Sequence, residues 1–144
     1  MSAQDPRLDA IVAYFETLSP NTLARLNTIY REDASFKDPF SDVQGIEAIR
    51  GVYAHMFQSL QQPRFVVTQR FAEGTECMLL WDFHFRARGL RHPDHCIRGA
   101  SHLTLAGDGR IARHRDYWDA AEELYEQVPL LGGFMRWLKR RAAG

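Results

Sequence analysis

The sequence predicts an α+β fold, in which three N-terminal helices pack on the concave side of a strongly curved antiparallel sheet. Two observations lead to this prediction. Apolar residues recur every three to four positions up to about residue 60, and then on alternate positions up to about residue 118. Glycine-containing turns separate the alternating segments, as they do between hairpin strands. A sheet curved around helices in this way would leave a cone-shaped cavity.

Two helices are expected at the start of the chain. Asp5 is suited to cap the first helix, and Pro6 to occupy its first turn. The apolar stripe of this helix covers about residues 6–18 and ends at the Ser-Pro-Asn sequence 19–21. The same tripeptide begins a second short helix, and the apolar face of that helix includes Tyr30.

A brief strand and a third helix follow. Residues 34–40 are rich in aromatic side chains and include Asp38-Pro39, which favours a strand that runs into a turn. Gly45 then begins a helix whose buried stripe extends from Ile46 to Leu60.

Four strands are expected over residues 64–72, 75–88, 95–106 and 110–118. Glycine-containing sequences at 72–74 and 107–109 indicate hairpin turns, and residues 89–94 form a longer connection. Residues 119–142 have a helical pattern interrupted by Pro129 and two glycines, so we expect an extra C-terminal helix. Its basic end is typical of a packed terminal helix, and less so of a segment that touches a membrane or a partner.

Composition bounds the class of protein. The 144 residues are 45% hydrophobic and 12% aromatic, which fits one globular domain over residues 1–144. Eighteen basic and 18 acidic side chains give no net charge, which argues against nucleic acid as the main partner. The two cysteines have neither a disulfide framework nor a metal-ligand spacing, and no signal peptide or membrane span is evident. We therefore expect a cytoplasmic protein.

Asp38 is the first candidate for catalysis. Phe36 and Phe40 flank it two positions away and could exclude water from its carboxylate, which would raise its pKa toward the working range of a general base. An Asp that precedes Pro is also a common turn residue with a solvated side chain. The sequence leaves both interpretations open.

Asp116 is the second candidate. In a strand, His114, Asp116 and Trp118 lie on the same face. A carboxylate between an imidazole and an indole is poorly explained by packing alone, because buried acids usually have a partner or a catalytic task. The alternative is a surface position or an ion pair with a neighbouring arginine.

Tyrosine and histidine offer further candidates. Tyr14 lies at the edge of the first helix's apolar stripe, where its hydroxyl would either donate to a ligand oxygen or be satisfied within the core. The densest histidine group, at residues 92–95, falls in an expected loop and lacks the spacing of a metal site, so we expect no metal ligands there. His102 and His114 lie on strands joined by a tight turn, where the fold could bring them together.

The strand over residues 75–88 has two different faces. One face is apolar and carries Cys77, Leu79, Trp81, Phe83 and Phe85. The other is mixed and carries Met78, Leu80, Asp82, His84 and Arg86. A mixed face is typical of a sheet surface that another subunit partly covers. We therefore expect a homodimer formed through this outer face.

The order of helices, Asp-Pro turn and curved meander resembles the NTF2-like superfamily, especially its SnoaL-like and ketosteroid isomerase-like branch. The resemblance extends from about Leu8 to Trp118 and is most specific in YREDASFKDPF at 30–40 and GIEAIR at 45–50. It implies a cone-shaped α+β barrel. It specifies function less closely, because the superfamily includes isomerases, cyclases, epoxide hydrolases, dehydratases and proteins without enzymatic activity.

The resemblance also implies roles for individual residues. Asp38 takes the place of the ketosteroid isomerase aspartate that moves the substrate's proton, Tyr14 that of the oxyanion-hole tyrosine, and Tyr53 that of a supporting tyrosine. Ser101 stands where that family has a protonated aspartic acid, which is a stronger hydrogen-bond donor. Asp116 is similar to the acid/base aspartate of the polyketide cyclases.

With these implications, we expect a pocket for a small apolar molecule that contains a carbonyl group or a ring. The catalytic set would be Asp38, Tyr14 and Asp116, which can perform acid/base chemistry without a cofactor. The pocket would be lined by Tyr53, Phe57, Trp81, Phe83, Phe85, Ser101, His114 and Trp118. An isomerase, cyclase or hydrolase fits this set. The alternatives are a protein that binds such a ligand without transforming it, and an interaction module that uses its outer sheet face.

Overall fold

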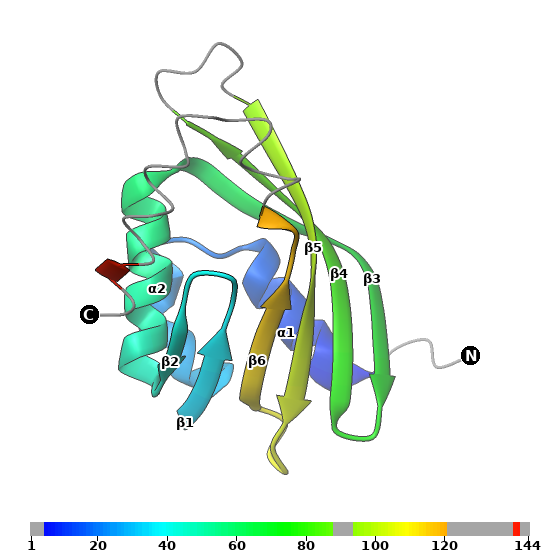
Figure 1. Cartoon of the computed structure of the whole chain (residues 1–144). Coiled ribbons are helices and arrows are strands. Elements are labelled where there is room, and N and C mark those ends of the chain that lie inside the picture. The colour runs from blue at the N-terminus through cyan, green and yellow to red at the C-terminus, as the bar shows by residue number, and fades with distance from the viewer. Residues whose placement is uncertain (1–4, 88–93, 121–139, 142–144) are drawn as a thin grey trace.

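The computed structural model describes residues 5–87, 94–120 and 140–141. The elements are α1 (Pro6–Glu16), the 3-10 helix η1 (Asn21–Thr28), β1 (Tyr30–Lys37), β2 (Asp42–Gln44), α2 (Ile46–Ser59), β3 (Gln61–Glu73), β4 (Glu76–Arg86), β5 (Asp94–Leu105) and β6 (Ile111–Tyr117). Figure 1 shows a single curved sheet with the helices on one side. The predicted α+β class is confirmed.

Six strands form the sheet, in the order β2-β1-β6-β5-β4-β3. Strands β3 to β6 make the predicted antiparallel meander, and Gly74 and Gly109 adopt positive φ angles in its turns. In contrast, β1 lies parallel to β6, so the sheet is mixed and not antiparallel throughout. The pairing begins where the N–H of Ile111 donates to the carbonyl of Ile29 at 2.7 Å. With β2 and β3 as its two edges, the sheet is curved but does not close into a barrel.

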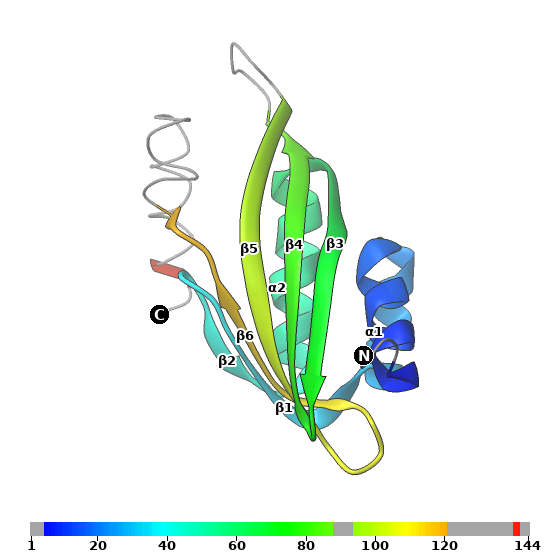
Figure 2. The same ribbon diagram turned by 90° about the vertical axis from the view of Figure 1, so that its right-hand side faces the viewer.

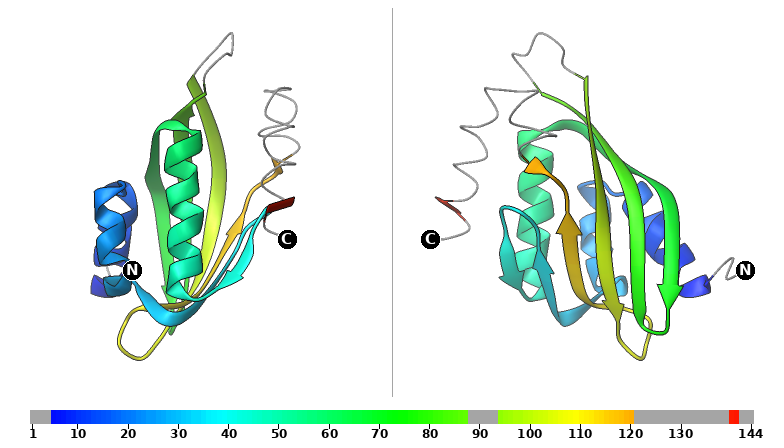
Figure 3. Two further views of the ribbon diagram at one scale, coloured as in Figure 1. Left: turned by 90° about the vertical axis from the view of Figure 1, so that its left-hand side faces the viewer. Right: turned by 45° about the vertical axis from the view of Figure 1, so that its right-hand side comes forward.

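The helices cover the concave face of the sheet. Helix α1 packs on β3. Helix α2 contacts β1 and β2, which lie toward one edge of the sheet, and also β3, which forms the other edge. Figures 2 and 3 show α2 lying across this face. Because a single helix reaches strands at both edges, the sheet must bend around it. Ile46, Ile49 and Tyr53 of α2 are buried in the core between helix and sheet.

Strand β4 has the two faces that the sequence predicts. Its alternate residues from Cys77 to Phe85 are buried among the core side chains. The intervening residues, from Met78 to His84, are half-buried on the outer face. This alternation is expected where one face of a strand meets the core and the other does not.

Three local features differ from the predicted elements. The second helix is a 3-10 helix with non-helical backbone angles at Arg25. Ser19 and Thr22 brace the turn that leads into it, since the backbone N–H of each donates to the hydroxyl of the other. Strand β1 begins at Tyr30, earlier than the predicted strand, and β2 is too short to show an alternating pattern.

Two predictions concern residues beyond this description. The C-terminal helix expected over about residues 119–142 falls almost entirely outside the described residues, and so does part of the histidine group at 92–95. Within the described ranges, no helix combines the length and apolar character that a membrane span requires.

Candidate active site

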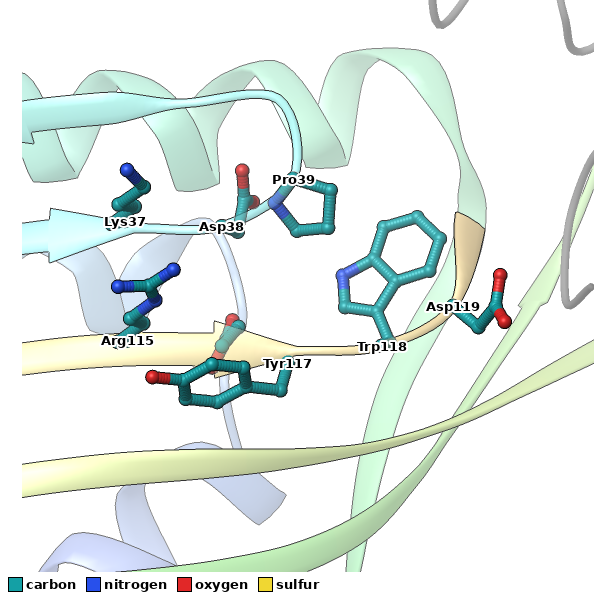
Figure 4. A pocket seen from close by; sticks show the side chains of 8 residues that line it. Lys37, Asp38, Pro39, Arg115, Tyr117, Trp118 and Asp119 are labelled. Atoms are coloured by element: carbon teal, nitrogen blue, oxygen red, sulfur yellow. The ribbon is translucent and has the colours of Figure 1, made fainter. Parts of the chain in front are cut away.

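A groove opens where β1 and β6 end. Because these strands run parallel, with Lys37 opposite Arg115, the segments that follow them leave the sheet side by side. The groove has a volume of about 590 Å³. Figure 4 shows its lining residues, which are Lys37, Asp38, Pro39, Arg115, Asp116, Tyr117, Trp118 and Asp119. The parallel pair thus brings together two carboxylates from distant parts of the chain, Asp38 and Asp116.

The turn between β1 and β2 holds the side chain of Asp38. Oδ1 of Asp38 accepts hydrogen bonds from the backbone N–H groups of Phe40 at 2.8 Å and Ser41 at 2.6 Å. The backbone N–H of Asp38 donates to the carbonyl of Ser41 at 2.9 Å. This is the turn geometry that an Asp-Pro sequence favours. Among the described residues, none makes a hydrogen bond to Oδ2.

The pKa of the Asp38 carboxyl is raised from 3.8 to about 6, chiefly because burial removes water and disfavours the charged form. The negative charge of Asp116 contributes to this rise. The two backbone N–H donors and His114 act in the opposite direction. A carboxyl group with a pKa of about 6 can both accept and release a proton near neutral pH.

Asp116 accepts two short hydrogen bonds on one oxygen. Nε2 of His114 lies 2.6 Å from Oδ1, and the hydroxyl of Ser101 donates to the same atom at 2.5 Å. Strand geometry explains both contacts, since His114 precedes Asp116 by two positions on β6 and Ser101 is directly opposite on β5. In the part of the chain that the structure covers, Oδ2 has no hydrogen-bond partner. It is therefore available to a molecule in the groove.

Buried side chains extend these contacts into a hydrogen-bonded chain. The hydroxyl of Tyr30 lies 2.6 Å from Nδ1 of His114 and 2.8 Å from the hydroxyl of Tyr53. On the other branch, the indole N–H of Trp81 donates to Oγ of Ser101 at 2.9 Å. The chain therefore connects α2 and four strands, β1, β4, β5 and β6, to the carboxylate of Asp116.

Donor and acceptor chemistry gives this chain a direction. An indole N–H can only donate, so Ser101 accepts from Trp81 and uses its one proton for Asp116. When the carboxylate of Asp116 is ionised it can only accept, so Nε2 of His114 carries the proton. When that imidazole is also neutral, its Nδ1 accepts from Tyr30. The hydroxyl of Tyr30 in turn accepts from Tyr53. Both branches of donors therefore converge on Oδ1 of Asp116.

The two tyrosines of the chain remain protonated. Burial raises the pKa of Tyr30 and of Tyr53 well above the usual value of 10, and the charge of Asp116 adds to this effect. Their hydroxyls therefore act as hydrogen-bond donors that hold the imidazole of His114 in one orientation. Among the carboxylates of the groove, Asp38 and Asp116 thus lie in different environments, an arrangement suited to an acid and a base with separate tasks.

Aromatic and basic side chains complete the groove. The ring of Trp118 projects toward the turn that holds Asp38 (Figure 4), and its centroid lies 5.4 Å from that of Phe40. The guanidinium of Arg115 lies over the ring of Tyr117, 4.8 Å from its centroid. A ligand in this groove would therefore meet an apolar wall, a basic rim and three carboxylates, those of Asp38, Asp116 and Asp119.

The other predicted site residues fall into two groups. Tyr53, Trp81, Ser101 and His114 belong to the chain behind Asp116 and are not among the lining residues. Phe57, Phe83 and Phe85 pack with the core and also lie outside this lining. The hydroxyl of Tyr14 donates to the carbonyl of Thr22 at 2.8 Å. A role for Tyr14 as an oxyanion donor stays a prediction.

Tyr30 is the member of the hydrogen-bonded chain that the sequence analysis missed. The pattern placed it on the apolar face of a helix, whereas it begins β1 and is fully buried. Its residue type could have indicated this role, because the hydroxyl of a buried tyrosine usually has a hydrogen-bond partner. His102 and His114 do not meet: His102 is paired with Glu76 at 2.8 Å, and His114 is directed into the core.

Side chains of types that can ligate a metal ion gather elsewhere in the described chain. Asp82, His84 and Cys96 have ligand atoms within 4.8 Å of one another. They lie on the outer face of the sheet, away from the inward-facing His114 and Asp116.

Fold and site together define a class of protein: a small α+β domain whose curved sheet, packed on helices, carries paired carboxylates at the end of a parallel strand pair. The model of the SnoaL-like domain matches residues 11–114. The chain belongs to this SnoaL-like domain family. The match contains Asp38 and ends two residues before Asp116. A search of curated proteins returned no match.

Solved structures share this fold. A protein from Shewanella putrefaciens, described as a SnoaL-like polyketide cyclase, has a TM-score of 0.73 and 20% identity over 88% of this chain and 98% of its own. A Catenulispora acidiphila protein with a ketosteroid isomerase-like fold, in complex with trimethylamine, has a TM-score of 0.71 and 18% identity over 85% and 92%. An LEH-like epoxide hydrolase from M. tuberculosis has a TM-score of 0.67 and 14% identity over 85% and 86%.

Proposed function

We propose that the protein binds a small, largely apolar molecule with a carbonyl group or a ring, and that it catalyses proton transfer on this molecule. The observation that carries the proposal is the pair of carboxylates, Asp38 and Asp116, that line one groove. Trp118 supplies an apolar surface beside them. An isomerase, a cyclase or a hydrolase would each use such a pair.

In this proposal the two carboxylates have different tasks. Asp38, whose pKa is about 6, accepts a proton from the substrate and returns it at another atom. Asp116 is the second acid or base, and His114 and Ser101 hold its carboxylate in place. No cofactor takes part. Tyr14 would join the set if its hydroxyl exchanged the Thr22 carbonyl for a ligand oxygen.

The known structures of this fold support a small-molecule site. One is described as a polyketide cyclase, one as an epoxide hydrolase, and one was solved in complex with trimethylamine. The alternative that we keep is a protein that binds its ligand without transforming it. Self-association through the outer face of β4 stays a prediction, which sedimentation equilibrium tests.

Proton abstraction can be tested before the natural substrate is known. A panel of small cyclic ketones and lactones is incubated with the protein in D₂O, and exchange of the hydrogens next to the carbonyl is followed by NMR. We expect catalysed exchange with at least one compound, and a rate that rises with pH through about 6, because Asp38 must be ionised to act as a base. Asp38→Asn should abolish this exchange.

Two comparisons make the test specific. Asp42→Asn changes an exposed carboxylate of the same hairpin, beyond the groove lining, and should leave exchange intact. Asp116→Asn should lower the pKa of Asp38, because it removes a nearby negative charge; carbon-13 NMR of the carboxyl group measures this without any substrate. Undiminished exchange in Asp38→Asn would exclude Asp38 as the base. Binding of the compounds without exchange would favour the non-catalytic alternative.

A further inference from the structure

Three side chains of different chemistry meet on the outer face of the sheet. Asp82 and His84 are two positions apart on β4 and therefore point to the same side. Cys96 of β5 is directly opposite His84 in the antiparallel register. All three are half-buried. The register of two adjacent strands thus fixes the relative positions of the three residues.

The distances between these side chains suit a shared metal ion. The carboxylate, imidazole and thiol ligand atoms all lie within 4.8 Å of one another. Around a tetrahedral Zn²⁺ ion, with bonds of about 2.0 to 2.3 Å, ligand atoms are about 3.5 Å apart. The separations therefore need to shorten by at most about 1.3 Å to reach those around a single ion.

The chemistry of the set selects among metals. A thiolate and an imidazole favour Zn²⁺ and similar ions over Mg²⁺ and Ca²⁺, which prefer oxygen ligands. Asp82 and Cys96 would bring two negative charges and so neutralise a divalent ion. Arg64 and Arg98 are the cross-strand neighbours of His84 and Asp82 and add positive charge at the edge of the set. Favourable binding therefore depends on both anionic ligands.

We propose that Asp82, His84 and Cys96 bind one Zn²⁺ ion on the outer face of the sheet, with water as the fourth ligand. The ion bridges β4 and β5 on the side opposite Trp81 and Ser101. Spacing along the chain does not predict this site, because its ligands come from two strands and meet only through their register. Acidification releases the ion, since protons compete for the imidazole and the thiolate.

The test uses the full chain, freed of metal and kept reduced with a phosphine. Titration with Co²⁺, which replaces Zn²⁺ in such sites, should give a thiolate-to-cobalt charge-transfer band that saturates at one ion per chain. Competition with a chromophoric chelator then measures the affinity for Zn²⁺. Cys96→Ser should abolish the band, and Cys96→Ser, His84→Gln and Asp82→Asn should each weaken Zn²⁺ binding by at least about tenfold.

His102→Gln is the matched control, because it removes a half-buried imidazole from the same strand, β5, and should leave binding unchanged. Circular dichroism confirms that each variant is folded. Absence of the charge-transfer band in the wild-type chain would overturn the proposal. Zn²⁺ affinity that is unchanged in both Cys96→Ser and His84→Gln would also overturn the proposal. An equal loss of affinity in His102→Gln would overturn it as well. Absorbance measures metal binding and sedimentation measures self-association, so the two properties of this face are tested independently.

Discussion

Asp38 combines two roles that its sequence context presents as alternatives. Its Oδ1 closes the turn between β1 and β2, as expected of an Asp before Pro. Its carboxyl is nevertheless buried enough for the pKa to rise to about 6. The turn uses one oxygen of the carboxylate and leaves the other without a partner among the described residues, so a structural residue can also face the groove.

Tyr30 gives a test of the buried hydrogen-bonded chain. In Tyr30→Phe, Nδ1 of His114 and the hydroxyl of Tyr53 each lose a hydrogen-bond partner. A buried polar group left without a partner costs about 1–3 kcal/mol, so we expect the free energy of unfolding to fall by that amount. Urea unfolding followed by fluorescence measures it.

The control for this experiment is Tyr117→Phe. Tyr117 is 48% exposed, so loss of its hydroxyl should change the free energy of unfolding by less than about 0.5 kcal/mol. Equal stability of Tyr30→Phe and the wild-type chain would show that the hydrogen bonds of Tyr30 contribute nothing to the fold.

At the scale of the elements, Gly99 allows the contact between β4 and β5 that positions Ser101. The indole of Trp81 lies over Gly99 and reaches Ser101 diagonally. A Cβ atom at position 99 would lie 2.3 Å from Cη2 of Trp81, which no real contact permits. Glycine at this position is therefore required by the close approach of the ring.

We predict that Gly99→Ala displaces Trp81 and destabilises the protein by about 1–3 kcal/mol, as overpacking of a core does. Thermal unfolding gives the change in stability, and the NMR signal of the indole N–H reports the loss of its bond to Ser101. Gly51→Ala serves as the control, since a Cβ there meets nothing within 4 Å and should stabilise α2 slightly. A Gly99→Ala protein with an unchanged indole signal would contradict this account.

Elements whose signals are local could be predicted from the sequence. The stripe of α2, the alternation of β4 and the turns at Gly74 and Gly109 follow from patterns within a few residues. The pairing of β1 with β6 could not be predicted in this way, because it depends on contacts between distant segments. Asp38 and Asp116 were therefore recognisable by their neighbours, whereas the groove they share required the structure.

For the molecule as a whole, Asp38 makes stability depend on pH. Its pKa is about 6 in the folded protein and about 3.9 in an unfolded chain, so the folded state binds more protons between these values. The contribution of Asp38 is therefore fully present below about pH 4 and is lost as the pH rises through about 6. Relative to Asp38→Asn, the wild-type protein should gain stability on acidification.

Urea unfolding of both proteins, from about pH 4 to about pH 7, measures this difference. Asparagine at position 38 can still accept from the backbone N–H groups of the turn, so the variant should fold. A difference between the two proteins that does not vary with pH would contradict the raised pKa of Asp38.

The parallel pairing of β1 with β6 also governs when the groove comes into existence. Strands β3, β4 and β5 are neighbours both in sequence and in the sheet, so a growing polypeptide can join them soon after each is made. Strand β1 must wait for β6, and closing so long a loop is a slow, entropically costly event. Asp38 is synthesised early, yet it gains Asp116 as a neighbour only at this late event. We therefore expect the groove and the complete sheet to form in the same step of folding.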